Sequence, residues 1–160
     1  MDSGKNPLYN VLVAFSKHMP EIGYCQGMNY LAGLILVGVD FDEVTAFTIL
    51  DKLMNERAQM ASLYEGQLVK LYRLSDAVYS WLLQEEPELE EFLSEQGVPL
   101  TTLLAGPFMA IFANIVDIDT ALHVLDRLVL QKEDALINII KQVLSFMKLK
   151  MLKIDDSGML

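Results

Sequence analysis

The stretch that decides the fold is Glu21–Gly33, which reads Glu-Ile-Gly-Tyr-Cys-Gln-Gly-Met-Asn-Tyr-Leu-Ala-Gly. It places two amide side chains, Gln26 and Asn29, in an otherwise apolar run and surrounds them with glycines at positions 23, 27 and 33. A glycine inside a helix costs about 1 kcal/mol relative to alanine, so this clustering indicates that a backbone or a ligand approaches closely. A glutamine in such a run needs partners for both ends of its amide, or it must face a cleft.

The size and charge of the chain limit what it can be. Its 160 residues are enough for one domain with a buried core and too few for two full domains. A hydrophobic content of 52% and a mean hydropathy of +0.31 indicate either a well-buried helical core or a domain that lacks a covering part. The net charge of −10 argues against nucleic acid and anionic lipid as partners, because both need basic surface.

The sequence contains no recognisable targeting or membrane-spanning segment. Its N-terminus is polar, and the longest apolar run, about 103–116, is interrupted by Gly106-Pro107. The single cysteine, Cys25, allows no internal disulfide, which favours a reducing compartment. We therefore expect a soluble, cytoplasmic protein that does not insert into a membrane.

Apolar residues recur at helical spacing along most of the chain, which predicts an all-α fold without a β-sheet. The first helix is expected to begin at Pro7 and to end before Pro20. Asp40 and Asp42 offer caps for a later helix, and Pro87 is expected to open another. Further helices are predicted at about 24–37, 64–83, 118–129 and 136–147, with a loop-rich joint at about 97–107 and a short tail at 155–160.

The predicted helix over 24–37 has a buried stripe that begins at Tyr24 and continues through Met28, Leu31 and Ile35. Gln26 lies on a different face by the same spacing. A core amide between two helices held close by glycine is one interpretation of Gln26, and an amide that faces a cleft is the other.

Other kinds of chemistry have weak support in the sequence. His18 and His123 stand alone, so we expect no metal site and no cofactor. Cys25 as a nucleophile would need a base, and His18 lies across a proline from it, so a small buried thiol is the favoured interpretation. No Gly-rich loop with Lys-Ser or Lys-Thr is present, so the chain itself should bind no nucleotide.

The string Ile22–Asn29, Ile-Gly-Tyr-Cys-Gln-Gly-Met-Asn, resembles the central motif of the TBC domain, the module of Rab GTPase-activating proteins. The resemblance extends over about 6–147, with matching segments at Asn6–Leu12, Phe41–Phe47, Leu63–Tyr64, Phe108–Phe112 and His123–Asp126. We accordingly assign residues 1–154 to a partial TBC-like domain and 155–160 to a C-terminal tail.

The resemblance implies a mechanism with two fingers. A glutamine from this motif orients the attacking water in the active site of a GTP-bound Rab, whose own site holds the Mg²⁺, and an arginine from an earlier motif neutralises phosphoryl charge. Gln26 matches this catalytic glutamine, and Tyr24 matches a tyrosine that shapes the same loop. Tyr24, Gly23, Gly27 and Asn29 are then expected to lie at the contact with the partner.

The chain departs from the family pattern in several places. The arginine motif, Ile-x-x-Asp-x-x-Arg, occurs nowhere in the sequence, and Arg57, Arg73 and Arg127 lie in later predicted helices. The family's tryptophan before Asp126 is replaced by Leu125. We therefore expect either a TBC domain truncated at its N-terminus or a divergent short copy.

The sequence and the resemblance lead to two main hypotheses about function and to a less favoured third. The first is a GTPase activator for Rab-type GTPases in vesicle trafficking, recruited to endomembranes through its partner and not an enzyme in isolation. The alternative is a catalytically inactive helical binding module that lacks the arginine finger. An independent enzyme that uses Cys25 is the remote third. Truncation would also expose apolar surface, so self-association is expected in that case.

Overall fold

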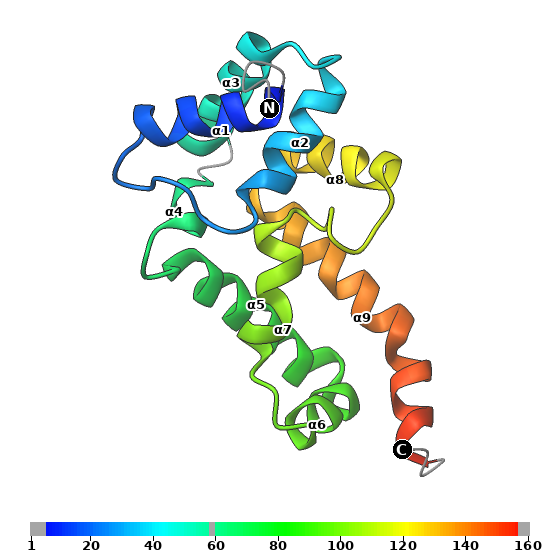
Figure 1. Ribbon diagram of the computed structural model, residues 1–160. Coiled ribbons are helices and arrows are strands. Elements are labelled where there is room, and N and C mark those ends of the chain that lie inside the picture. Colours follow the sequence, from blue (N-terminus) through cyan, green and yellow to red (C-terminus); the bar gives the residue numbers. More distant parts are fainter. Residues whose placement is uncertain (1–5, 58–59, 157–160) are drawn as a thin grey trace.

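The computed structural model describes residues 6–57 and 60–156, and within these ranges every regular element is helical (Figure 1). The predicted all-α fold is therefore confirmed for the described part of the chain. In chain order the elements are α1 (Pro7–His18), α2 (Met28–Gly38), α3 (Glu43–Lys52), the π-helix η1 (Leu53–Arg57), α4 (Ala61–Tyr64), α5 (Val69–Glu85), α6 (Pro87–Glu95), α7 (Leu100–Met109), α8 (Ile118–Gln131) and α9 (Glu133–Asp156).

The helices form two groups that share one apolar core. In the first group α1, α2 and α3 pack on one another, and in the second α5 contacts α6, α7 and α9. Helix α2 joins the groups through α8, which also packs along α9 (Figure 1). The largest fully buried side chains come from both groups and include Phe15, Met28, Leu31, Leu50, Leu71, Phe108 and Phe112.

Short polar side chains cap the starts of α1 and α3. The side chain of Asn6 accepts a hydrogen bond from the Tyr9 N–H at 3.1 Å, one residue before the predicted start of α1 at Pro7. Asp42 accepts from the Thr45 N–H at 2.6 Å and starts α3, as predicted. Each cap satisfies a backbone donor that the first turn of a helix leaves open.

The helix predicted over 24–37 starts later than expected, at Met28. The preceding residues form a turn, because Gly23 has a φ of +63° and Gly27 a φ of +105°, and neither angle fits a right-handed helix. The prediction that Tyr24 belongs to the buried stripe was therefore wrong, since its side chain is 56% exposed. The stripe begins instead at Met28 and continues through Leu31 and Ile35, which are buried.

The single long helix predicted over 64–83 is in fact two helices. Tyr64 ends α4, and α5 begins at Val69 after a turn that contains Gly66. Leu68 adopts a left-handed φ of 50° at the start of α5, which breaks the helical path. The apolar spacing crosses this turn because residues on both sides of it face the same core.

Two further boundaries also differ from the prediction. Gly106 and Pro107, expected in a loop, lie within α7 near its C-terminal end. Asp155 and Asp156, expected in the tail, belong to the last turn of α9. In the ranges that the structure describes, no helix is long and apolar enough to cross a membrane.

Candidate functional site

The loop between α1 and α2 carries the motif and is held by its own hydrogen bonds. The Gly23 N–H donates to the Met19 carbonyl at 2.9 Å, which closes the turn after α1. Further on, the Met28 N–H donates to the Cys25 carbonyl at 3.2 Å, and the Met28 sulfur accepts from the Cys25 N–H at 3.1 Å. The backbone around Gln26 is therefore fixed on both sides.

Gly27 is buried against the C-terminal end of α7. A Cβ atom at this position would lie 2.7 Å from the Met109 carbonyl oxygen and 2.9 Å from the Met109 Cβ. The motif glycine thus permits a close backbone approach, as predicted from its residue type. The backbone that approaches is the chain's own, so the packing of α7 accounts for Gly27 without any partner.

The side chains of Tyr24 and Asn29 make hydrogen bonds within the loop. The Oδ1 atom of Asn29 accepts hydrogen bonds from the Gly27 N–H at 3.3 Å and from the Tyr24 hydroxyl at 3.4 Å. These hydrogen bonds join the loop to Asn29 at the start of α2. The expected contact of both residues with a partner remains a prediction, and the Tyr24 ring is open to solvent.

Gln26 itself is exposed at the edge of a hollow of about 370 Å³. Its amide makes no hydrogen bond to any residue in the part of the chain that the structure describes. The hollow, called the Gln26 hollow below, lies between the motif loop and the end of α7 and is lined by Gln26, Gly27, Tyr30, Ala105, Gly106, Met109, Ala110 and Asn114. The interpretation of Gln26 as a core amide between two helices was wrong, because the side chain is not enclosed.

Two residues that support the loop were missed by the sequence analysis. The Tyr64 hydroxyl donates a hydrogen bond to the Met109 carbonyl at 2.8 Å, the same carbonyl that faces Gly27. Burial of the Tyr64 ring raises the pKa of this hydroxyl, so it remains a protonated donor at neutral pH. Both residues are far from the motif in the sequence. They lie in the family-like segments Leu63–Tyr64 and Phe108–Phe112, but no local pattern indicated that they contact each other and the motif.

Cys25 has the character of a partly buried thiol. Burial raises the pKa of the Cys25 thiol, which keeps it protonated and weakly nucleophilic near neutral pH. The nearest base considered from the sequence, His18, has its Nε2 atom 3.1 Å from an Asp51 carboxylate oxygen instead. Among the described residues, no group of three or more His, Cys, Asp or Glu side chains is arranged to hold a metal ion.

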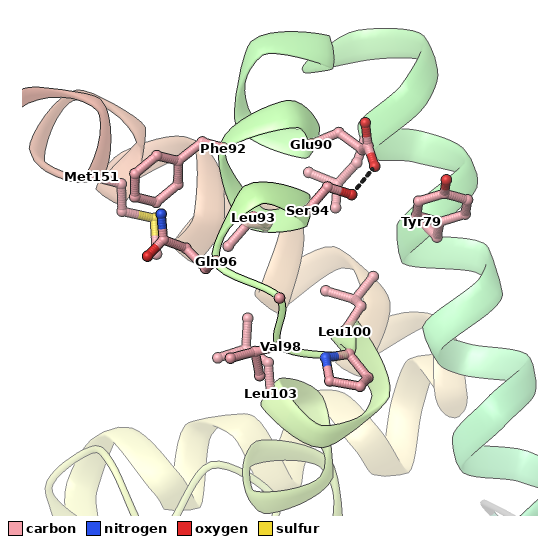
Figure 2. A pocket seen from close by; sticks show the side chains of 13 residues that line it. Tyr79, Glu90, Phe92, Leu93, Ser94, Gln96, Val98, Leu100, Leu103 and Met151 are labelled. Atoms are coloured by element: carbon pink, nitrogen blue, oxygen red, sulfur yellow. Dashed lines mark hydrogen bonds between the residues drawn. The ribbon is translucent and has the colours of Figure 1, made fainter. Parts of the chain in front are cut away.

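Gln26 does not line two further hollows in the described part of the chain. The larger, of about 670 Å³, is formed by α5, α6, the segment leading into α7, and Met151 of α9; Figure 2 shows its mainly apolar lining around Phe92, Leu93 and Leu103. It contains none of the predicted site residues. A second hollow of about 380 Å³ lies between the start of α1, α2 and the start of α8, and it shares the Tyr30 ring with the Gln26 hollow.

Comparison with known proteins identifies the family. The family model described as the Rab-GTPase-TBC domain matches residues 1–154. The chain belongs to the TBC domain family. The predicted resemblance to this family is therefore confirmed.

The relatives of this TBC domain are longer proteins. It is 31% identical over 121 residues to growth hormone-regulated TBC protein 1 of Xenopus tropicalis, a match over 76% of this chain and 34% of that protein. It is 26% identical over 159 residues to Rab GTPase-activating protein eat-17 of Caenorhabditis elegans, which covers 99% of this chain and 18% of that protein. The chain spans about two fifths or less of the length of these relatives. No solved structure matches the chain.

Proposed function

We propose that this TBC domain binds the GTP-loaded form of a Rab-type small GTPase and that Gln26 orients the water that attacks the γ-phosphate. The supporting observation is an exposed amide without an internal hydrogen bond, on a loop that several other hydrogen bonds hold in place. A neutral amide can donate one hydrogen bond and accept another, which is what positioning a water requires.

The rigid loop matters for such a role. Gly27 packs on Met109, and Asn29 bonds the Gly27 N–H, so the Gln26 backbone is held before any partner arrives. An amide that is already positioned loses less conformational freedom when it meets the attacking water. The Mg²⁺ and the nucleotide belong to the GTPase in this proposal. Recruitment to endomembranes would follow from the partner, in the course of vesicle trafficking.

The expected acceleration by this chain is small. An arginine finger contributes on the order of 10³–10⁵ to the rate of GTP hydrolysis, and the arginine motif of the family does not occur in the 160 residues. That absence favours the second candidate function, a TBC domain that binds a GTPase without accelerating its reaction. The two candidates share the binding step and differ only in the role of Gln26.

Single-turnover phosphate release from a panel of GTP-loaded Rab proteins tests the proposal. With the chain in excess, we expect hydrolysis roughly 10-fold above the intrinsic rate for at least one member and a return to the intrinsic rate for Gln26→Ala. Gln67→Ala, which changes another exposed loop glutamine, is the matched control and should behave like the wild type.

A parallel binding measurement separates the two candidates. Binding of the GTP-loaded form without faster hydrolysis would support the inactive module and reject the role of Gln26. If wild type and Gln26→Ala both leave every rate unchanged and no GTPase binds, both candidates fail.

A further inference from the structure

A second free amide, that of Asn114, also lines the Gln26 hollow. Asn114 lies in the segment between α7 and α8, is exposed, and makes no hydrogen bond to any residue in the ranges described. The Nδ2 atom of Asn114 would be 3.1 Å from a Cβ atom at Gly106. The Asn114 amide therefore occupies space that is open because residue 106 has no side chain. Gln26 and Asn114 are far apart in the sequence, and only the packing of α7 on the motif loop brings them to one hollow.

The rest of the lining indicates what kind of group the Gln26 hollow can take. None of its lining residues is charged, so the hollow itself offers no cation for a phosphate group and no carboxylate for a metal ion. Half of the lining residues are small, namely Gly27, Ala105, Gly106 and Ala110. A hollow with small lining residues and two uncharged amides suits polypeptide main chain, because a peptide unit presents one donor and one acceptor at short range.

The Tyr30 ring closes the hollow on the side of α2 and is 41% exposed. A partly exposed aromatic ring offers an apolar face against which a bound segment of a partner can pack, at little cost in conformational entropy. The ring and the two amides therefore form a short groove in which an extended segment can be hydrogen-bonded and covered.

We infer that Asn114 is a second recognition residue, which hydrogen-bonds the main chain of the GTPase loop that borders the bound nucleotide. This inference rests on the proposed function, because it assigns Asn114 to the contact that brings Gln26 to the attacking water. Asn114 holds the partner's loop, and Gln26 acts on the reaction. The two amides should accordingly affect different kinetic parameters.

Michaelis–Menten analysis with the most responsive GTPase of the panel tests this assignment. For Asn114→Ala we expect the KM for the GTP-loaded GTPase to rise about 10-fold with kcat nearly unchanged, since the variant loses binding and leaves Gln26 in place. For Gln26→Ala we expect kcat to fall. Asn138→Ala removes an exposed asparagine of α9 and should match the wild type.

A milder variant tests the geometry. Gly106→Ala keeps both amides, and its added methyl group displaces the amide of Asn114, so we expect a smaller rise in KM in the same direction. Thermal melts of Asn114→Ala and Asn138→Ala should agree with that of the wild type, because both side chains are exposed.

The outcomes separate the inference from the proposed function. An unchanged KM for Asn114→Ala, together with a lower kcat for Gln26→Ala, would overturn the inference and leave the proposed function standing. If the chain binds the GTPase without accelerating it, the same comparison is made on the dissociation constant of the GTP-loaded form. If the wild-type chain binds no GTPase of the panel, the inference fails together with the proposed function.

Discussion

At the scale of single residues, the motif loop depends on one glycine and one carbonyl group. Gly27 has a φ of +105° and lies against the Met109 carbonyl, so two independent restrictions act on the same residue. Replacement by alanine adds backbone strain and a clash with a main chain that cannot move without moving α7. The identity of residue 27 is therefore set by packing within the chain.

We predict that Gly27→Ala lowers the free energy of unfolding by about 2–4 kcal/mol, from the strained φ and the overlap with Met109. Urea denaturation followed by circular dichroism measures this change. Gly33→Ala is the control, because Gly33 lies within α2 and a Cβ atom there would meet nothing within 4 Å. It should leave stability unchanged or raise it slightly, since alanine favours a helix. Equal stability of the two variants would contradict the role given to Met109.

We also predict that Tyr64→Phe costs about 1–2 kcal/mol, because the Met109 carbonyl loses its hydroxyl donor in a partly buried position. Tyr72→Phe, at an exposed position of α5, should cost nothing measurable. Chemical denaturation of both variants decides the point, and a Tyr64→Phe protein as stable as the wild type would show that water replaces the hydroxyl.

At the scale of elements, the caps determine where the helices begin and thus where the loops end. Asp117 accepts hydrogen bonds from the N–H and the hydroxyl of Thr120, both at 2.9 Å, and starts α8. The segment that carries Asn114 ends at this cap, so the start of α8 also fixes one end of that segment. These hydrogen bonds lower the pKa of the Asp117 carboxyl below its ordinary value, with the backbone N–H of Thr120 as the largest cause.

The lowered pKa of the Asp117 carboxyl predicts how the stability of the folded protein changes with pH. A carboxyl group whose pKa is lower in the folded than in the unfolded protein stabilises the fold. This stabilisation is complete when the pH is above the pKa of the group in the unfolded protein, and it is lost as the pH falls through the pKa of the group in the folded protein. We expect the melting temperature of Asp117→Ala to lie a few degrees below that of the wild type at pH 7. The difference should shrink as the pH falls below about 4.

Asp117→Asn provides the matched comparison for this titration. An asparagine caps a helix about as well as an aspartate but does not titrate in this range. Its melting temperature at pH 7 should therefore stay near that of the wild type. Thermal melts between pH 3 and pH 7 test both variants, and a constant gap between wild type and Asp117→Ala would refute the proposed linkage.

At the scale of the whole molecule, the chain carries an uncovered apolar hollow beside its motif. The hollow of about 380 Å³ between α1, α2 and α8 is lined by Phe41, Val37, Tyr30 and Ile118 among other mainly apolar residues. Phe41 is 58% exposed and Ile118 is 56% exposed. An apolar hollow of this kind beside the proposed GTPase contact is where the expected self-association would begin.

We predict that the isolated chain binds a hydrophobic dye and self-associates through this apolar hollow. Phe41→Asp should reduce both effects, and its positive φ of 60° suits aspartate better than phenylalanine. Phe146→Asp is the control, because Phe146 is 77% exposed on α9 and does not line the hollow. Light scattering and dye fluorescence measure the response. A monomeric wild type without dye binding, or equal effects of the two variants, would contradict the prediction.

The sequence by itself determined the features that depend on neighbouring residues. Pro7 and Pro87 start helices where predicted, and Asp42 caps α3, because proline geometry and capping act within one turn of the chain. The need for a close approach at Gly27 and the TBC resemblance of the motif were likewise readable from residue types. These are local properties of the chain, and local patterns predict them.

Only the tertiary structure decided which groups meet at the site. The partner of Gly27 is Met109, the donor to Met109 is Tyr64, and the second amide of the Gln26 hollow is Asn114. The apolar periodicity also predicted a helix that begins too early, within the Gly23–Gly27 turn. Apolar spacing indicates which residues are buried, but it does not indicate the backbone angles between them. Contacts between distant segments arise when α7 packs on the motif loop, and that packing places Gln26 at an open hollow.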